Sequence, residues 1–167
     1  VNGEVMFSTK KLDPHVVPAL YQMADVTINI SDAEGFGLAT LESLSCGTPI
    51  IATMTGGLQE QVVGSFGMNG IGLYPSSKAI IGSQQVPYIY EDRISKKAFI
   101  AALNQMYDGG EEFRKELGEN GRKHILENYN FDDFNKRWVD LMLQVHEECG
   151  SWETRKGYSS ITFKEVA

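Results

Sequence analysis

The composition of this 167-residue chain is that of one ordinary globular domain, with 42% hydrophobic residues to build a core. Its net charge of -7 excludes the basic field that nucleic acids or anionic membranes require, and no apolar run approaches the roughly 20 residues that span a bilayer. We therefore expect a cytoplasmic protein that binds neither. Cys46 and Cys149 lie far apart and outside any Cys/His cluster, so we expect free thiols and no structural metal site.

Short apolar runs alternate with amphipathic stretches over the first part of the chain. Runs rich in β-branched residues predict strands, and apolar residues at helical spacing predict helices. Such alternation is typical of an α/β fold with a parallel sheet. In chain order we predict a strand at Val5–Phe7, a helix over about 14–24, a strand over 26–30, a helix from Leu38 to Ser45, a strand over 49–53, a short helix over 58–63 and an edge strand over 70–74.

The second half of the chain begins with a segment that follows neither period. Residues 75–94 contain Pro75, Gly82 and Pro87, and we interpret them as an excursion with room for a short hairpin. Because the segment leaves the last strand, we predict that it forms a flap over the ligand cleft. Three helices are predicted beyond Ser95, so that residues 1–149 form the domain and residues 150–167 a loosely ordered tail.

The loop between the strand at 26–30 and the helix at Leu38 carries the most informative residues. It lies at the carboxyl end of a predicted parallel strand, which is where α/β proteins bind ligands. Gly35 and Gly37 allow a ligand to approach the backbone closely. The amides from Phe36 to Ala39 form an anion site that the helix dipole reinforces. We therefore predict that this loop binds a phosphate group.

Two glutamates, Glu34 and Glu42, flank this loop. A carboxylate beside a phosphate would be repelled, so we expect both to accept hydrogen bonds from ligand hydroxyl groups. This predicts a diphosphate at the helix N-terminus, a ribose near Glu42 and a second polyol near Glu34, which together make a nucleotide sugar. The plainer interpretation is that acidic residues are favoured near helix starts anyway. The third glycine of the NAD fingerprint is missing, which argues against NAD.

These residues are part of a longer ordered pattern. It comprises residues 24–26, 31, 34–38, 42, 46–52, 56–57 and 60. The pattern resembles the C-terminal, donor-binding domain of retaining GT-B glycosyltransferases with the Glu-x7-Glu motif, the glycosyl transferases group 1. The resemblance runs from about Val5 to Pro75 and continues more weakly to about residue 145. It implies a Rossmann-like parallel sheet followed by C-terminal helices.

The resemblance also implies roles for individual residues. Glu34 would be catalytic, contacting the donor sugar and supporting the reacting centre, and Glu42 would bind the ribose. The sugar and the diphosphate would be held by the loop residues Gly35, Phe36, Gly37 and Leu38. The implied reaction is hexosyl transfer from a nucleotide sugar to an unidentified glycan, lipid or protein acceptor, with retention of configuration, in carbohydrate biosynthesis. No metal and no cofactor are implied, because basic side chains and helix amides take the charge of the leaving diphosphate.

Part of the family's pattern is missing from this chain. The Arg and Lys that grip the diphosphate, and the acceptor-binding domain, would precede Val1, so we expect a part of a longer enzyme that is inactive alone. The Val5–Phe7 strand would lie at the far edge of a 3-2-1-4-5-6 sheet, separated from the strand at 26–30 by two absent strands. An exposed sheet edge would also allow a homo-oligomer. The alternatives are a non-catalytic nucleotide-sugar-binding or regulatory remnant and a nucleotide-sugar epimerase of the same architecture.

Overall fold

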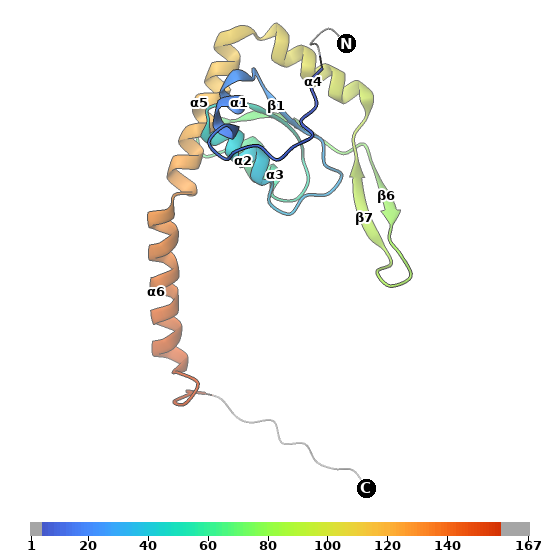
Figure 1. Cartoon of the computed structure of the whole chain (residues 1–167). Helices are drawn as coiled ribbons and strands as arrows, with labels where there is room; N and C mark the ends of the chain where they lie inside the picture. Colours follow the sequence, from blue (N-terminus) through green and yellow to red (C-terminus); the bar gives the residue numbers. More distant parts are fainter. Residues whose placement is uncertain (1–4, 158–167) are drawn as a thin grey trace. The chain divides into compact units, whose positions relative to one another are not determined.

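The computed structural model describes residues 5–157, and its contacts divide the chain into two units at Asn128 and Tyr129. The first unit is an α/β fold built on a parallel sheet, as predicted (Figure 1). The sheet has the order β1-β2-β5. Its strands are β1 (Thr27–Asn29), β2 (Ile50–Thr53) and β5 (Gly70–Leu73), which agree with three of the predicted strands.

The centre of the sheet is β2, whose four residues are all buried. Ile51 packs in one cluster with Leu73 of β5 and with Ala102 and Met106 from a later helix. Successive residues of a strand point to opposite faces, so Ile50 on the same strand faces the other side of the sheet. Both faces of the sheet are therefore covered, as is usual when strands are parallel.

Five helices lie in the described part of this unit. α2 and α3 contact β2, whereas α4 contacts β5, and α5 packs against α2. α4 begins where the Ser95 hydroxyl accepts a hydrogen bond from the amide of Ala98 at 3.1 Å. The bounds are α1 Val17–Met23, α2 Leu38–Ser45, α3 Leu58–Val62, α4 Lys96–Asp108 and α5 Gly110–Asn128, close to the predicted ones.

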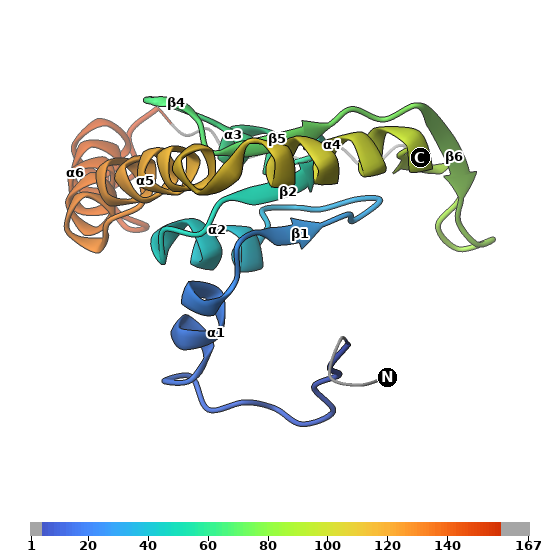
Figure 2. The same ribbon diagram turned by 90° about the horizontal axis from the view of Figure 1, so that it is seen from above.

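Two antiparallel hairpins interrupt the α/β pattern. The first pairs β3 (Val63–Gly64) with β4 (Gly67–Met68), and strands of two residues are too short to be predicted from a hydrophobic pattern. The second, β6 (Ser77–Ile81) with β7 (Ile89–Arg93), forms the hairpin for which residues 75–94 had room. Figure 2 shows this hairpin beyond the arrowheads of the sheet strands, on the side of their carboxyl ends.

The predicted strand at Val5–Phe7 is wrong. These residues form no strand, and Met6 and Phe7 are 87% and 85% exposed. A strand is stabilised by its ladder partners, and none of the described strands pairs with this segment. Over the described residues, the sheet consists of the three neighbouring strands β1, β2 and β5.

The second unit contains α6 (Phe131–Cys149) and the turn that follows it. The Asn130 side chain caps α6 by accepting a hydrogen bond from the Asp133 amide at 2.8 Å. Phe134 makes edge-to-face contacts with Phe131 and Trp138, each with ring centroids 6.3 Å apart. The predicted tail, residues 150–167, lies outside the described residues from position 158 onward.

Candidate functional site

The predicted ligand loop, residues 31–37, runs from the carboxyl end of β1 to the start of α2. Glu34 is half-buried, and its Oε1 accepts a hydrogen bond from the Gly35 amide at 3.1 Å. Phe36 and Leu38 are 41% and 67% exposed, so two large apolar side chains are partly accessible to solvent at the loop. Exposed apolar groups next to a polar loop are suited to cover a bound ligand.

The start of α2 has the geometry of an anion site. Gly37 precedes the helix with a φ of 88°, and no side chain caps it. The Thr40 hydroxyl, in the first turn of α2, donates to the Gly37 carbonyl oxygen at 2.8 Å and so does not accept from a helix-start amide through this bond. The amides of Leu38 and Ala39 belong to the first turn, where an α-helix offers no intrahelical acceptor. Amides in this position can donate to an anion, and the binding of a ligand phosphate by these two stays a prediction.

A buried amide side chain holds the loop in place. Gln61 of α3 is fully buried, and its Nε2 donates to the carbonyl oxygens of Phe36 at 2.6 Å and Gly37 at 3.2 Å. Sequence reasoning missed this residue. The available signal was a polar residue on the apolar stripe of a short helix, next to Leu58 and Val62.

The loop after β2 also contacts the backbone of the ligand loop. The Gly57 amide donates to the carbonyl oxygen of Gly35 at 3.0 Å. A Cβ at Gly57 would lie 2.8 Å from three backbone atoms of Gly35 and Phe36. The sequence was equally compatible with a plain turn at Gly56-Gly57, whereas the structure uses the missing side chains to bring two loop backbones together.

Glu42 lies on the exposed side of α2 and lines a cavity of about 620 Å³. Lys10 and Lys11 line the same cavity, and they are basic residues that sequence reasoning did not assign to the site. The other predicted carboxylate, Glu34, is not among the described residues that line this cavity. The structure thus places both glutamates on one strand–loop–helix unit but only Glu42 in this cavity. The other lining residues are Ser8, Leu12, Pro14, Val17, Pro18, Tyr21, Ser45 and Cys46.

Tyr21 of α1 is hydrogen-bonded to Glu42. Its hydroxyl donates to the Glu42 Oε2 at 3.0 Å. Burial, followed by the hydrogen bond that Tyr21 donates to Glu42 and by the negative charge of Glu42, raises the pKa of Tyr21 from 10.0 to about 12. The hydroxyl therefore keeps its proton, and its ability to donate, up to strongly alkaline pH.

The raised pKa of Tyr21 predicts an alkaline contribution to stability. A group whose pKa is higher in the folded state stabilises the fold fully below its unfolded pKa, and this stabilisation is lost as the pH rises through the folded pKa. We expect wild-type protein to lose more unfolding free energy than Tyr21→Phe between pH 10 and about pH 12. Urea unfolding at several pH values measures this. Tyr107→Phe is the control, because Tyr107 is 82% exposed, and it should follow the wild type.

The β6–β7 hairpin is attached to the ligand loop at its base. The Asp92 amide donates to the Asp32 carbonyl oxygen at 2.8 Å, and Arg93 Nη1 lies 2.8 Å from Asp32 Oδ2. The hairpin therefore leaves the carboxyl edge of the sheet, which confirms the position predicted for residues 75–94. Its closing over a ligand stays a prediction.

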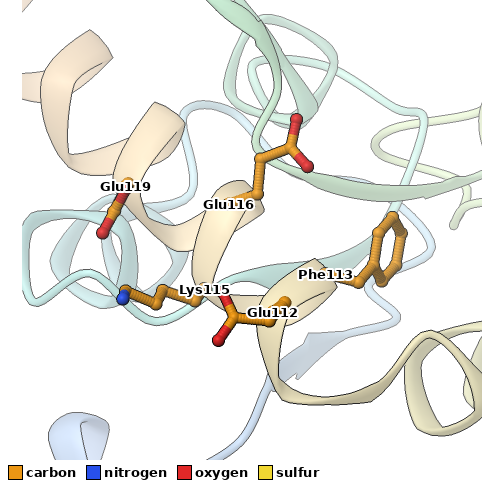
Figure 3. A pocket seen from close by; sticks show the side chains of 5 residues that line it. All are labelled: Glu112, Phe113, Lys115, Glu116 and Glu119. Carbon is orange, nitrogen blue, oxygen red and sulfur yellow. The ribbon is translucent and has the colours of Figure 1, made fainter.

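Another cavity, of about 410 Å³, lies along α5 and contains none of the predicted site residues (Figure 3). It is lined by three glutamates, Glu112, Glu116 and Glu119, with Phe113 and Lys115. The excess of carboxylates makes it unsuitable for a phosphate. In the part of the chain that the structure describes, no group of three His, Cys, Asp or Glu side chains is arranged to hold a metal ion. None of the described helices is long and apolar enough to cross a membrane.

Comparisons with known proteins point to one family. Residues 2–124 match the family described as glycosyl transferases group 1. An uncharacterized glycosyltransferase of Methanocaldococcus jannaschii is 30% identical over 131 residues, which are 78% of this chain and 28% of that protein. The D-inositol 3-phosphate glycosyltransferase of Paenarthrobacter aurescens is 43% identical over 72 residues, which are 40% of this chain and 17% of that protein.

A solved structure shares the fold. Sucrose-phosphate synthase from Thermosynechococcus elongatus superposes with a TM-score of 0.64 at 24% identity, over 82% of this chain and 29% of that chain. The fold of the present chain is therefore that of a GT-B protein's Rossmann-like part. The chain spans 28% of the M. jannaschii relative and 29% of the synthase chain, so it corresponds to less than a third of each.

Proposed function

The chain belongs to the glycosyl transferases group 1 family, and from that premise we propose that it is the donor-binding part of a longer glycosyltransferase. The proposed donor is a nucleotide sugar, and the proposed reaction transfers its hexosyl group to a glycan, lipid or protein acceptor with retention of configuration. No metal or other cofactor takes part in the proposed reaction. The retaining chemistry and the nucleotide-sugar donor rest on the resemblance of the Glu34 to Glu42 segment to the Glu-x7-Glu motif.

One observation carries this proposal: a carboxylate, a set of helix-start amides and a second carboxylate follow one another on the β1–loop–α2 unit. The loop is fixed by Gln61 and by the Gly57 amide, so its backbone is preorganised before a ligand arrives. Glu42 faces a cavity that two lysines also line. This order of groups suits a ligand with hydroxyl groups at both ends and phosphates in the middle.

In the proposed reaction, the bond between the sugar's anomeric carbon and the diphosphate oxygen breaks. The electron pair stays on the diphosphate, where the amides of Leu38 and Ala39 stabilise the added negative charge. The Glu34 carboxylate accepts hydrogen bonds from the sugar hydroxyls and stabilises positive charge that develops at the anomeric carbon. The oxygen of an acceptor hydroxyl then forms the new bond to the anomeric carbon on the face that the diphosphate leaves, which retains the configuration. The proton of that hydroxyl passes to the departing diphosphate oxygen.

The open edge of β1 supports a longer polypeptide. Among the described strands, β1 is an end strand of the sheet, and Ile28 in its middle is 43% exposed. An unpaired, partly apolar edge invites another strand. We propose that strands of the longer enzyme pair here, with a second copy of the chain as the alternative occupant.

The 167-residue chain by itself is expected to bind nucleotide sugars with a dissociation constant of about 1 mM or weaker, roughly −4 kcal/mol, and to transfer no sugar. Its net charge of -7 disfavours a dianionic ligand, and catalysis needs both halves of a two-domain cleft. Calorimetric titration with UDP-, GDP- and ADP-sugars tests this. A micromolar constant, or any turnover with a sugar acceptor, would contradict the proposal that this chain holds only the donor half of the site.

A further inference from the structure

The hydrogen bond between Tyr21 and Glu42 joins two helices through functional groups that line one cavity. We propose that Tyr21 is a positioning residue: its hydroxyl fixes the Glu42 carboxylate through Oε2, so that the carboxylate is oriented to accept hydrogen bonds from vicinal hydroxyl groups of the ligand. This inference rests on the proposed function, because it takes those hydroxyl groups to be the ribose of a nucleotide. Oε1 of Glu42 is the oxygen that Tyr21 does not engage.

The need for such a partner follows from the exposure of Glu42. A glutamate on the exposed side of a helix samples several rotamers, and binding a ligand would have to fix one of them. Tyr21 is half-buried and has few rotamers available, so a hydrogen bond from it restricts the glutamate in advance. Preorganisation of this kind increases affinity without adding a contact to the ligand.

The Tyr21 hydroxyl has this role separately from the attachment of α1. The backbone of Tyr21 is held by the buried Thr48, whose hydroxyl donates to the Tyr21 carbonyl oxygen at 2.7 Å. That bond forms with any residue at position 21. Removing only the hydroxyl, as in Tyr21→Phe, therefore leaves α1 attached and the ring in place. The variant tests the orientation of Glu42 rather than the packing of the helix.

The charges around the cavity are consistent with this role. Lys10 and Lys11 line it and can attract the phosphates of a nucleotide, but they do not distinguish a ribose from another group. Hydroxyl recognition needs an acceptor, and Glu42 is the carboxylate among the lining residues. Selectivity for hydroxyl groups should therefore depend on Glu42 and, through it, on Tyr21.

The experiment compares ribonucleotides with analogues that lack the two ribose hydroxyls. The 167-residue chain is titrated with UDP, GDP and ADP and with their 2′,3′-dideoxy counterparts, and binding is followed by NMR, which measures millimolar constants. For the preferred base, we expect Tyr21→Phe to weaken ribonucleotide binding about three- to ten-fold and to leave dideoxynucleotide binding unchanged. Glu42→Ala should abolish the difference between the two ligands, and adding Tyr21→Phe to it should change nothing further.

A second route avoids any effect of the aromatic substitution on folding. Glu42→Asp keeps the charge but shortens the side chain by one methylene, so that Tyr21 no longer reaches it. This variant should lose ribonucleotide affinity as Tyr21→Phe does. Tyr107→Phe, an exposed tyrosine that lines a different cavity, is the matched control and should behave as wild type.

The outcomes separate the two proposals. If Tyr21→Phe and Glu42→Asp both keep the wild-type preference for the ribonucleotide, the positioning role is overturned while the donor site stands. An equal loss for both ligands in Tyr21→Phe would indicate a purely structural role and would also overturn it. If the wild-type chain binds ribo- and dideoxynucleotides equally, the proposed nucleotide site itself fails, and the role of Tyr21 fails with it.

Discussion

Gly56→Ala is expected to destabilise the sheet-containing unit by about 3 kcal/mol. A Cβ at Gly56 would collide with the carbonyl oxygen of Glu34, which is backbone and cannot rotate away. The φ of Gly56 is 48°, so an alanine there would also be strained. Because the obstacle belongs to the ligand loop, relief of the collision would have to displace that loop.

Two other glycines separate the causes of this effect. Gly35→Ala should change the free energy of unfolding by less than about 0.5 kcal/mol, since nothing lies within 4 Å of its Cβ. Gly47→Ala has equally open space but a φ of 81°. Backbone strain alone should therefore lower its free energy of unfolding, by about 1 kcal/mol. Urea denaturation of the three variants measures all of these differences. If Gly56→Ala were no less stable than Gly47→Ala, the close approach of the two loops would be wrong.

The second large effect concerns catalysis. In the longer enzyme that we propose, Glu34→Ala should lower kcat about 10-fold to 100-fold, and Glu42→Ala should weaken donor binding by a similar factor. A charge-assisted hydrogen bond is worth roughly 1.5 to 3 kcal/mol. Glu34 is assigned to the reacting sugar, so its contribution increases in the transition state, whereas a ribose far from the reaction is bound equally in both states.

Steady-state kinetics with varied donor concentration test this division, provided that the fold of each variant is intact by circular dichroism. Glu116→Ala removes the same charge from the exposed surface of α5 and should leave both parameters unchanged. Finding every kinetic parameter of the Glu34 and Glu42 variants within about two-fold of wild type would refute the site assignment. An effect of Glu42→Ala on kcat alone would reverse the two roles.

Local sequence signals were sufficient for the elements that surround the ligand loop. α2 was predicted from Leu38 to Ser45 and forms over those residues, because glycines stand on both sides of an apolar stripe. β2 was predicted from a run of β-branched residues, and all four of its residues are buried. Such signals depend only on neighbours along the chain, which the sequence contains.

Long-range contacts decided the remainder. The Val5–Phe7 run has strand-forming residues but finds no ladder partner among the described residues, so it forms no strand. Gly56-Gly57 had the sequence of a plain turn, and only the approach of the Glu34 carbonyl oxygen shows why side chains are excluded there. The contact between Tyr21 and Glu42 joins residues from two helices. A residue's own pattern specifies its backbone conformation, but its partner across the fold is fixed only when the sheet and helices pack together.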